Sequence, residues 1–327
     1  MSLPKKIAIV GLGGWATSMH LPACRRVQEA GRARYCGLCD REEVKARSAA
    51  ALLGGTAYTD LDSMLQAEKP DGLVILVKPD ATPRLIEVAI KRQIPFLTEK
   101  PPASSVQVHR QLLAKVGTLP HVIAYNRRFT PYTVKARAWM QGCPLQTVEA
   151  SFCRFRRLEA DFTGTAVHGI DTVLFLAGGH LAEARLEVVR KDAIRNFFLT
   201  AWTQENCRIQ LSITPDSAFN TEEYVLRSTA RNASIKYPWQ GVDPGGVCLY
   251  EDDKLKQELS ACDFGLAADD WSSMSGIREE HENFIDLLEG KRPAIATLQD
   301  TLNTQILREA FGNIPAGAAR QVVEMQL

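Results

Sequence analysis

Short apolar runs alternate with longer amphipathic segments over roughly the first 125 residues of the chain. The runs Ile7–Val10 and Leu73–Val77 are apolar throughout, which is typical of strands that are buried on both faces of a sheet. Segment 82–92 instead repeats apolar residues at helical spacing. The predicted strands are residues 6–11, 34–39, 72–77, 94–98 and 121–125, and the predicted helices are residues 15–29, 41–53, 60–67, 82–92 and 104–116. This alternation predicts an α/β domain with a parallel, doubly wound sheet.

After residue 145 the pattern changes to longer segments in which apolar and polar residues alternate. Cys207–Ile213 alternates in this way and follows Phe197–Thr203 after a short polar stretch, which predicts a hairpin. The remaining predicted strands are 146–156, 184–190, 222–228 and 246–250, and the predicted helices are 278–289 and 298–312. We therefore expect an α+β domain with an open, mainly antiparallel sheet. The predicted division is a parallel α/β domain at 1–125 and an α+β domain with C-terminal helices at 126–327.

The composition of the chain limits the partners, the location and the metal sites that can be expected. The chain of 327 residues carries 39 basic and 38 acidic residues, so its charge gives no reason to expect a nucleic acid or an anionic membrane as partner. Neither a signal peptide nor a membrane span fits the N-terminal segment. The eight cysteines are scattered, which favours reduced thiols and a cytoplasmic location. Cys36 and Cys39 fall on opposite faces of a predicted strand, and no His, Cys or Asp spacing indicates a metal site.

A glycine turn joins the first predicted strand to the first predicted helix. Gly11 permits a tight turn, Gly13 and Gly14 let the backbone approach a phosphate, and the small Ala16 lets the helix pack close to the strand. N–H groups at the start of that helix favour an anion. Trp15 is unusual here, and its indole either covers a nucleotide or packs against the second domain. The loop predicts a site for a dinucleotide pyrophosphate.

Asp40 ends the second predicted strand, 24 residues beyond Ala16. A carboxylate at about this offset accepts hydrogen bonds from an adenosine ribose and repels a 2′-phosphate, which favours NAD over NADP. Arg41 supports the opposite preference, since a guanidinium can hold that phosphate. An ordinary solvated Asp–Arg pair at a strand end is the structural alternative.

Further segments give the chain a family resemblance. They are Glu99-Lys100-Pro101, Tyr125–Phe129, His168–Asp171, Glu280–Asp286 and Gly290–Pro293. Together with the glycine loop, they resemble the glucose-fructose oxidoreductase, inositol dehydrogenase and rhizopine-catabolism (Gfo/Idh/MocA) family over nearly the whole chain. The resemblance implies a dinucleotide-binding Rossmann-type domain at 1–125 and a substrate and oligomerisation domain with an open antiparallel sheet at 126–327. It also implies an NAD(P)-dependent oxidoreductase acting on sugars, polyols or their derivatives.

The resemblance also implies roles for individual residues. Lys100 matches the lysine that contacts substrate and assists proton transfer, and an ammonium group is suited to stabilise a developing alkoxide. His168 matches the catalytic histidine, and imidazole titrates near neutrality. Glu99 is expected to accept hydrogen bonds from ribose or substrate, and Asp171 to orient or cap. A cis peptide bond commonly precedes the proline that corresponds to Pro101.

One position departs from the family pattern. Gly164 stands where the family usually has an aspartate, four residues before the histidine. Asp161 would share a helical face with His168 only if this segment were a helix, which Gly164 and its neighbouring threonines disfavour. Thr165 can supply a hydrogen bond but no charge. We expect either an altered proton relay based on Lys100 and His168 or a loss of the oxidoreductase activity.

Other candidates are less specific. Lys78 and Pro79 follow the third long predicted strand, where they either touch the cofactor or form a loop surface. Tyr125, Asn126 and Arg127 match positions near nicotinamide and substrate. His20 resembles a family residue near the cofactor, although packing within a helix explains it equally well.

The leading interpretation is an NAD(P)-dependent dehydrogenase or reductase of a sugar or polyol, with a homodimer or homotetramer as the expected assembly. Two alternatives remain open. One is a nucleotide-binding regulator without turnover, which Gly164 favours. The other is an NAD-using glycosidase, in which a hydride is removed and returned within one cycle.

Overall fold

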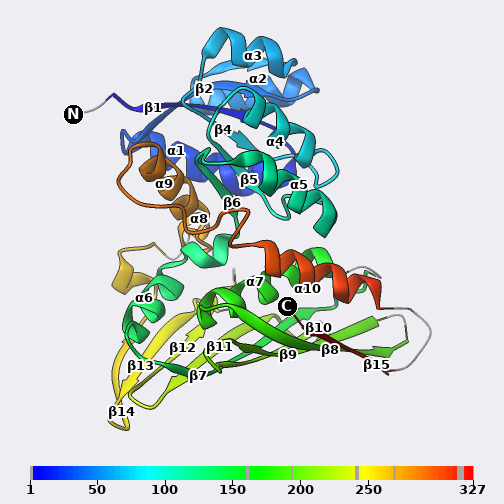
Figure 1. Ribbon diagram of the computed structural model, residues 1–327. Coiled ribbons are helices and arrows are strands. Elements are labelled where there is room, and N and C mark those ends of the chain that lie inside the picture. Colours follow the sequence, from blue (N-terminus) through cyan, green and yellow to red (C-terminus); the bar gives the residue numbers. More distant parts are fainter. Residues whose placement is uncertain are drawn as a thin grey trace. The chain divides into compact units, whose positions relative to one another are not determined.

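The computed structural model describes residues 3–159, 162–192, 194–239, 243–267, 270–314 and 320–326 (Figure 1). The chain forms two compact units, and neither is continuous in sequence. The first comprises Met1–Phe129 and Gly276–Leu302, and the second comprises Thr130–Ser275 and Asn303–Leu327.

The first unit contains a six-stranded parallel sheet in the order β3-β2-β1-β4-β5-β6. Its strands are β1 (Lys5–Val10), β2 (Ala33–Cys39), β3 (Thr56–Tyr58), β4 (Gly72–Ile75), β5 (Phe96–Glu99) and β6 (His121–Ala124). Its connecting helices are α1 (Leu21–Glu29), α2 (Glu43–Leu53), α3 (Leu61–Glu68), α4 (Thr82–Lys91) and α5 (Val106–Val116). The predicted doubly wound sheet is confirmed, and β3 is an additional short strand. The strand order reverses between β1 and β4, where ligands of such sheets bind.

Local chemistry sets where several of these helices begin and end. The Asp60 side chain caps α3 by accepting the N–H of Ser63 at 2.7 Å, and Ser105 caps α5 by accepting the N–H of Val108 at 3.3 Å. Gly54 ends α2 in the left-handed region at φ +76°. The caps of α3 and α5 end the loops that follow β3 and β5 at the carboxyl edge of the sheet.

Helix α9 (Ile277–Leu288) also belongs to the first unit. Its Phe284 and Ile285 are buried in the same apolar cluster as the strands, and a Cβ at Gly72 would meet the Phe284 ring at 2.8 Å. The following segment joins the sheet too, since the Ile123 N–H donates to the Ala296 carbonyl at 2.8 Å. The two compact units therefore differ from the predicted division at residue 125, because this amphipathic helix buries its apolar stripe against the first sheet.

The second unit contains a nine-stranded mixed sheet in the order β14-β13-β12-β11-β7-β10-β9-β8-β15. Its strands are β7 (Leu145–Phe155), β8 (Leu181–Lys191), β9 (Ile194–Thr203), β10 (Arg208–Ser217), β11 (Thr221–Ser228), β12 (Arg231–Lys236), β13 (Gly246–Glu251), β14 (Lys254–Leu259) and β15 (Arg320–Gln326). Neighbours are antiparallel except β7 and β10. The hairpin predicted for β9 and β10 is confirmed by the pairing of Trp202 with Arg208.

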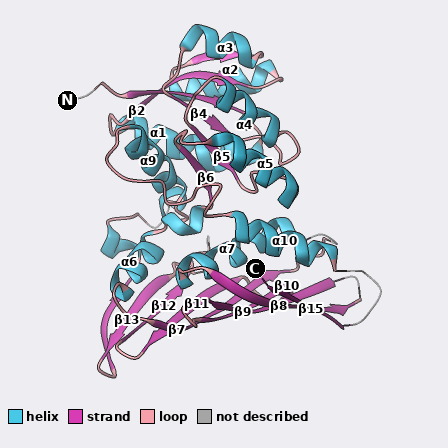
Figure 2. Cartoon of the chain, viewed as in Figure 1, coloured by secondary structure: helices cyan, strands magenta, loops and turns pink. Residues whose placement is uncertain are grey.

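Helices of the second unit cover one face of this sheet, as Figure 2 shows for α6 (Pro131–Met140) and α7 (Thr163–Ala177). The short α8 (Trp271–Met274) precedes the return to the first unit, and α10 begins at Leu302 and ends at Asn313. Helix α7 corrects the sequence analysis, which disfavoured a helix around Gly164. Ile170 and Val173 of α7 are fully buried in the apolar core, and this packing outweighs the low helix propensity of Gly164 and the adjacent threonines.

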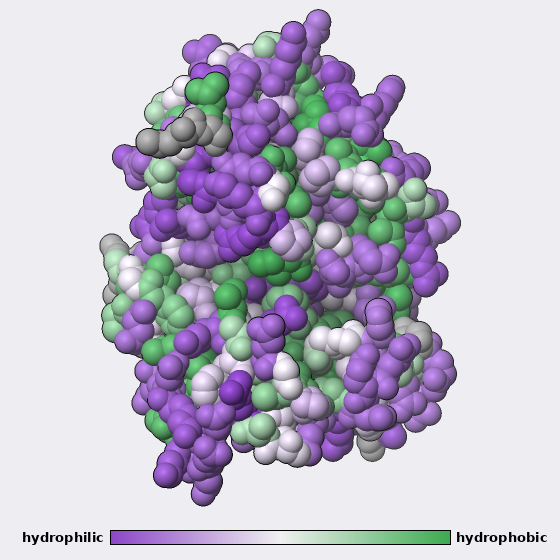
Figure 3. All heavy atoms as spheres, turned by 60° about the vertical axis from the view of Figure 1, so that its left-hand side comes forward, coloured by the Kyte–Doolittle hydropathy of each residue, from purple (hydrophilic) through white to green (hydrophobic). Residues whose placement is uncertain are grey.

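No helix among the described residues is both long and apolar enough to cross a membrane. The face drawn in Figure 3 is a mixture of hydrophilic and hydrophobic residues. Large apolar side chains are exposed on four strands of the second sheet: Phe155 on β7, Phe198 on β9, Leu255 on β14 and Val322 on β15. This sheet thus presents apolar groups to solvent in the single chain.

Candidate functional site

The glycine loop after β1 has the geometry that a bound pyrophosphate requires. Gly11 lies at φ +91°, and a Cβ there would come within 2.6 Å of the Leu76 carbonyl oxygen, so only glycine fits. A Cβ at Gly13 or Gly14 would have nothing within 4 Å, which leaves open space beside the loop. Helical structure starts at Gly14, and the first N–H groups of a helix have no partner within it. The loop therefore fits an anionic group at this end of the sheet.

Asp40 lies directly beside this loop. Its Oδ2 accepts the N–H of Leu12 at 2.8 Å, and its Oδ1 accepts the N–H of Glu42 at 2.9 Å. The predicted acidic residue of the second strand thus meets the glycine loop at the carboxyl edge of the sheet. Arg41, Lys78 and Pro79 are exposed, and the Lys78 carbonyl accepts the N–H groups that start α4. The structure places all of these residues in loops that follow β2 and β4.

Glu99 ends β5 and gathers three hydrogen bonds. Its Oε1 accepts the indole N–H of Trp15 at 2.9 Å and lies 2.8 Å from Nε2 of His20, while its Oε2 accepts the N–H of Lys100 at 3.1 Å. Burial by itself raises the pKa of the Glu99 carboxyl, but the hydrogen bond and electrostatic interaction with His20, together with the positive charge of Lys100, outweigh it and hold the pKa below its usual value. The Lys100–Pro101 peptide bond is cis, as the resemblance implied.

Trp15 is half exposed, and its ring meets His20 edge-on with centroids 6.5 Å apart. Within the first unit its N–H is satisfied by Glu99. Trp15 therefore connects the glycine loop to the Glu-Lys-Pro turn, a contact that sequence reasoning did not foresee.

Behind Glu99 lies a buried polar cluster. Nδ1 of His20 is 3.0 Å from Nε2 of His281, and Glu280 of the same helix is fully buried with neither carboxylate oxygen hydrogen-bonded. Burial raises the pKa of Glu280 well above its usual value. Burial, and to a lesser extent the electrostatic interaction with His20, lowers the pKa of His281 well below its usual value. Cys24 Sγ lies 3.7 Å from Nε2 of His281.

Ligand atoms of His20, Glu280 and His281 lie within 4.8 Å of one another among the described residues. The two ring nitrogens that face each other share a hydrogen bond, however, so they are not arranged around a common metal position. Sequence reasoning missed His281 and Glu280. Two polar residues on the buried face of an amphipathic helix were the signal that could have found them.

Tyr125 and Asn126 are buried after β6, and Arg127 donates to Oδ1 of Asn126 at 3.1 Å. The neighbouring Arg128 is also buried and donates to the carbonyls of Ile295 and Asp300. This arginine fastens the turn after β6 to the segment that follows α9, so the position of the candidate residues depends on it.

In the second unit, His168 is half buried on α7, one helical turn after the exposed Gly164. The carboxylate of the buried Asp171 accepts the Thr304 hydroxyl of α10 at 3.0 Å, so Asp171 links two helices. Thr165 Oγ1 lies 3.4 Å from the Arg157 guanidinium. Asp161 lies outside the described residues. The structure thus places His168, Thr165 and Asp171 on one helix.

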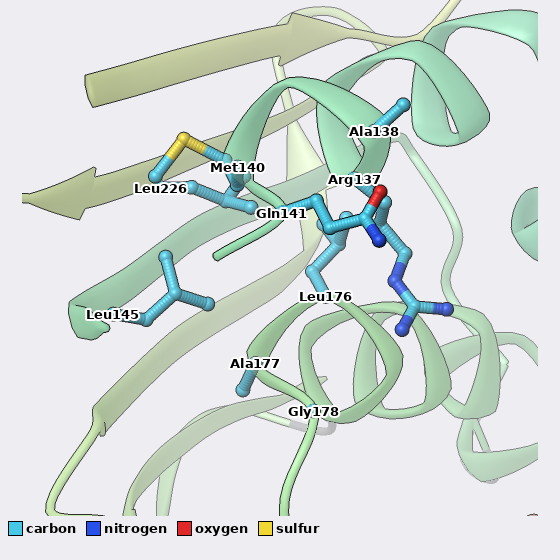
Figure 4. Close-up of a pocket in the computed structure, with 9 residues that line it drawn as sticks. All are labelled: Arg137, Ala138, Met140, Gln141, Leu145, Leu176, Ala177, Gly178 and Leu226. Carbon is cyan, nitrogen blue, oxygen red and sulfur yellow. The ribbon is translucent and has the colours of Figure 1, made fainter. Parts of the chain in front are cut away.

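Described residues of the second unit line cavities in two places. One, of about 380 Å³, lies between the C-terminal ends of α6 and α7 and is lined by Arg137, Gln141 and apolar residues (Figure 4). The other, of about 650 Å³, is lined by residues of β11 to β14 and adjoining segments. Neither is lined by a residue that the sequence analysis singled out.

Residues 5–125 match the protein-family model GFO_IDH_MocA, described as "Oxidoreductase family, NAD-binding Rossmann fold". No curated protein matches the chain.

Solved structures share the fold across nearly the whole length. A dehydrogenase from Chromobacterium violaceum aligns with a TM-score of 0.82 and 15% identity, over 95% of this chain and 94% of that one. An oxidoreductase from Agrobacterium radiobacter in complex with NAD+, L-tartaric acid and magnesium has a TM-score of 0.78 and 15% identity, over 98% of both chains. UDP-N-acetylglucosamine 3-dehydrogenase GnnA from Acidithiobacillus ferrooxidans has a TM-score of 0.75 and 18% identity, over 94% and 97%. At these identities the likeness shows a common fold.

Proposed function

We propose that the chain is an oxidoreductase of the Gfo/Idh/MocA family, whose NAD-binding Rossmann model matches residues 5–125. We propose that it transfers a hydride between a nicotinamide nucleotide and a hydroxyl-bearing carbon of a sugar, a polyol or a derivative. Two of the similar structures support this substrate and cofactor class. One was solved with NAD+ and L-tartaric acid, and the other is a nucleotide-sugar dehydrogenase.

The observation that carries the proposal is the convergence of the glycine loop, Asp40 and Glu99 at the carboxyl edge of the first sheet. Asp40 accepts a hydrogen bond from the backbone of the glycine loop. Glu99 accepts one from Trp15, which lies at the start of the helical segment that follows this loop. These residues fit a dinucleotide, with the carboxylate of Asp40 toward the adenosine ribose. We propose a preference for NAD over NADP on that ground.

When bound, the nicotinamide supplies the hydride acceptor or donor. The chain's own residues then deal with the proton of the substrate hydroxyl. Lys100 provides an ammonium group that stabilises the alkoxide, and the imidazole of His168 takes up the proton and returns it in the reverse direction. Since Gly164 supplies no carboxylate one turn before His168, we propose that this imidazole works without the charged partner of the family pattern.

We further propose that the protein works as a homodimer or homotetramer in a reducing compartment such as the cytoplasm. The eight cysteines are all free. The exposed apolar side chains of the second sheet would be covered by another copy of the chain. Light scattering after gel filtration tests the assembly, and a monomeric mass would contradict it.

The first test is fluorescence titration with NADH and with NADPH. We expect NADH to bind more tightly and Asp40→Ala to weaken NADH binding by about tenfold or more, since a ribose hydrogen bond to a charged group is lost. Asp62→Ala, which removes an exposed carboxylate paired with Arg92, is the matched control. Tighter binding of NADPH would overturn the cofactor preference, and binding of neither nucleotide would refute the proposed function.

The second test is turnover with a panel of sugars and polyols, with Lys100→Ala and His168→Ala as comparisons. Net formation of NADH that both variants reduce supports the dehydrogenase. Release of a sugar without net NADH would indicate an NAD-using glycosidase instead. Nucleotide binding without any turnover would indicate a regulator, the alternative that Gly164 favours.

A further inference from the structure

The carboxylate of Glu99 is one end of a buried row of side chains in the first unit. Oε1 of Glu99 lies 2.8 Å from Nε2 of His20, and Nδ1 of His20 lies 3.0 Å from Nε2 of His281. Both imidazoles are almost completely buried. The row comes from three separate elements, since Glu99 ends β5, His20 precedes α1 and His281 lies on α9.

The hydrogen-bonding capacity of these groups determines which group in the row donates and which accepts. An ionised carboxylate only accepts hydrogen bonds, so Nε2 of His20 must carry a hydrogen and donate it to Glu99. When His20 is neutral, its Nδ1 is then an acceptor, and Nε2 of His281 must donate to it. Glu99 and His281 together therefore hold a neutral His20 in one form, with its hydrogen on Nε2.

Charged and titratable groups surround this row on every side. Glu99 and Lys100 face it from the end of β5, and Glu280 reaches within 3.8 Å of Nδ1 of His20 from α9. Cys24 of α1 contacts His281, and Tyr35 of β2 lies beyond Cys24. Burial raises the pKa of the Cys24 thiol to about 12, so this group stays a neutral thiol at physiological pH.

The backbone explains why two side chains reach the same carboxylate from one segment. Ala16–His20 is a π-helix, and the Leu21 N–H donates to the Ala16 carbonyl. Residues five apart lie about 140° apart around an α-helix, whereas i→i+5 hydrogen bonding brings them nearly onto one face. Trp15 and His20 therefore both reach Glu99.

We propose that His20 and His281 are positioning residues for the reaction. His281 fixes the ring of His20, and His20 together with Trp15 fixes the carboxylate of Glu99. The other oxygen of that carboxylate accepts the backbone N–H of Lys100, so the row determines where the turn that carries this lysine lies. The inference rests on the proposed function, and it adds that the nucleotide-binding loop and the Lys100 turn are held by the same carboxylate.

The test compares variants that keep or remove the hydrogen bond to His20. His281→Gln retains an amide N–H that can donate to Nδ1 of His20, whereas His281→Leu does not. His109→Gln is the matched control, because His109 is also fully buried in the first unit but bonds to the Leu298 carbonyl outside the row. Thermal unfolding and NADH titration establish for each variant that the first unit is folded.

We expect His281→Leu to lower kcat about tenfold or more, with less than a threefold change in KM for the nucleotide and a shifted pH profile, since small displacements of a catalytic group have large effects. His281→Gln should recover most of kcat, and His109→Gln should stay within twofold. If His281→Leu binds NADH and its kcat equals that of His109→Gln, the proposal is overturned.

A second readout does not depend on turnover. ¹⁵N spectra of histidine-labelled protein should show His20 with its hydrogen on Nε2, and His281→Leu should abolish this single form. A hydrogen on Nδ1 of His20, or a metal ion held by these rings in native mass spectrometry, would refute the row. Absence of turnover in the unmodified protein would refute the proposed function, and these spectra would still decide on the row.

Discussion

The three glycines after β1 have different physical reasons to be glycine. Gly11 needs a positive φ and has the Leu76 carbonyl against its Cα, so its requirement comes from the fold of the first unit. Gly13 and Gly14 face open space, so the fold itself leaves room for a side chain there. We propose that their requirement comes from a bound dinucleotide, whose phosphates would approach the backbone.

This difference predicts opposite outcomes for two similar substitutions. Gly11→Ala should lower the free energy of unfolding by about 2 kcal/mol or more, because the added Cβ would lie 2.6 Å from the Leu76 oxygen at an unfavourable φ. Gly14→Ala should change the melting temperature little and weaken NADH binding. Thermal unfolding and fluorescence titration measure both effects. Unchanged NADH affinity in Gly14→Ala would contradict the placement of the pyrophosphate.

Glu279 should make the stability of the protein depend on pH. Burial raises its pKa from 4.5 to about 8, and its Oε2 has no hydrogen-bond partner. The folded state therefore holds a proton that the unfolded chain releases above pH 4.5, so this group lowers stability progressively as pH rises from about 4.5 to 8.

Replacing Glu279 by Gln should remove that loss. We expect Glu279→Gln to raise the free energy of unfolding by on the order of 1 to 3 kcal/mol at pH 8, with a gain that fades toward pH 5. Denaturant unfolding at several pH values measures it. Glu282→Gln on the partly exposed side of the same helix is the control, and an equal gain at pH 5 and pH 8 would show that burial of the Glu279 charge is not the cause.

Among the elements, the buried strands of the first unit were predicted well because an uninterrupted apolar run has few alternatives next to a glycine turn. Strand β3 was missed, since it is only three residues long and none of them is buried. The first residues of α7 have low helix propensity, so a helix was not expected there. The residues that bury its apolar face, Ile170 and Val173, lie in later turns. Local propensity at a helix start was a poor guide where packing of later turns supplied the stability.

Since α7 is a helix, Gly164 and His168 lie one turn apart on the same face. Gly164 is exposed in the first turn, where a carboxylate is favoured by the helix dipole, and a Cβ there meets nothing within 4 Å. Gly164→Asp should therefore fold, raise the pKa of His168 and increase turnover at neutral pH, as the family pattern implies.

Gly164→Ala is the control for this change. It should stabilise the protein by about 0.5 to 1 kcal/mol through helix propensity and leave turnover unchanged. NMR titration of His168 and the pH profile of turnover separate the two effects. An equal turnover for Gly164→Asp and Gly164→Ala would show that a carboxylate at this position does not assist His168.

For the whole molecule, the sequence predicted the architecture of both sheets. It did not predict which segments of the chain belong to which compact unit. Amphipathic periodicity showed that segment 278–289 has an apolar face, and it could not show which sheet that face covers. Only packing decides this, and Phe284 against Gly72 is the contact that does so. The pairing of His20 with His281 was hidden for the same reason, since the two residues are 261 positions apart.

Because the first unit is built from two separate segments of the chain, a fragment that contains only the first segment should not fold. Residues 1–129 contain all six strands of the first sheet, but without 276–302 they lack Phe284 and Ile285 of the core and the acceptors of Arg128. We expect residues 1–129 alone to aggregate or unfold without cooperativity and to bind no NADH, because a buried arginine and a large apolar surface are left uncovered. Joining 276–302 to residues 1–129 through a flexible Gly/Ser linker should restore a cooperative transition and NADH binding. Circular dichroism during heating and fluorescence titration measure both. A cooperative, NADH-binding fragment 1–129 would show that α9 is accessory and that the predicted boundary near residue 125 is sufficient for folding.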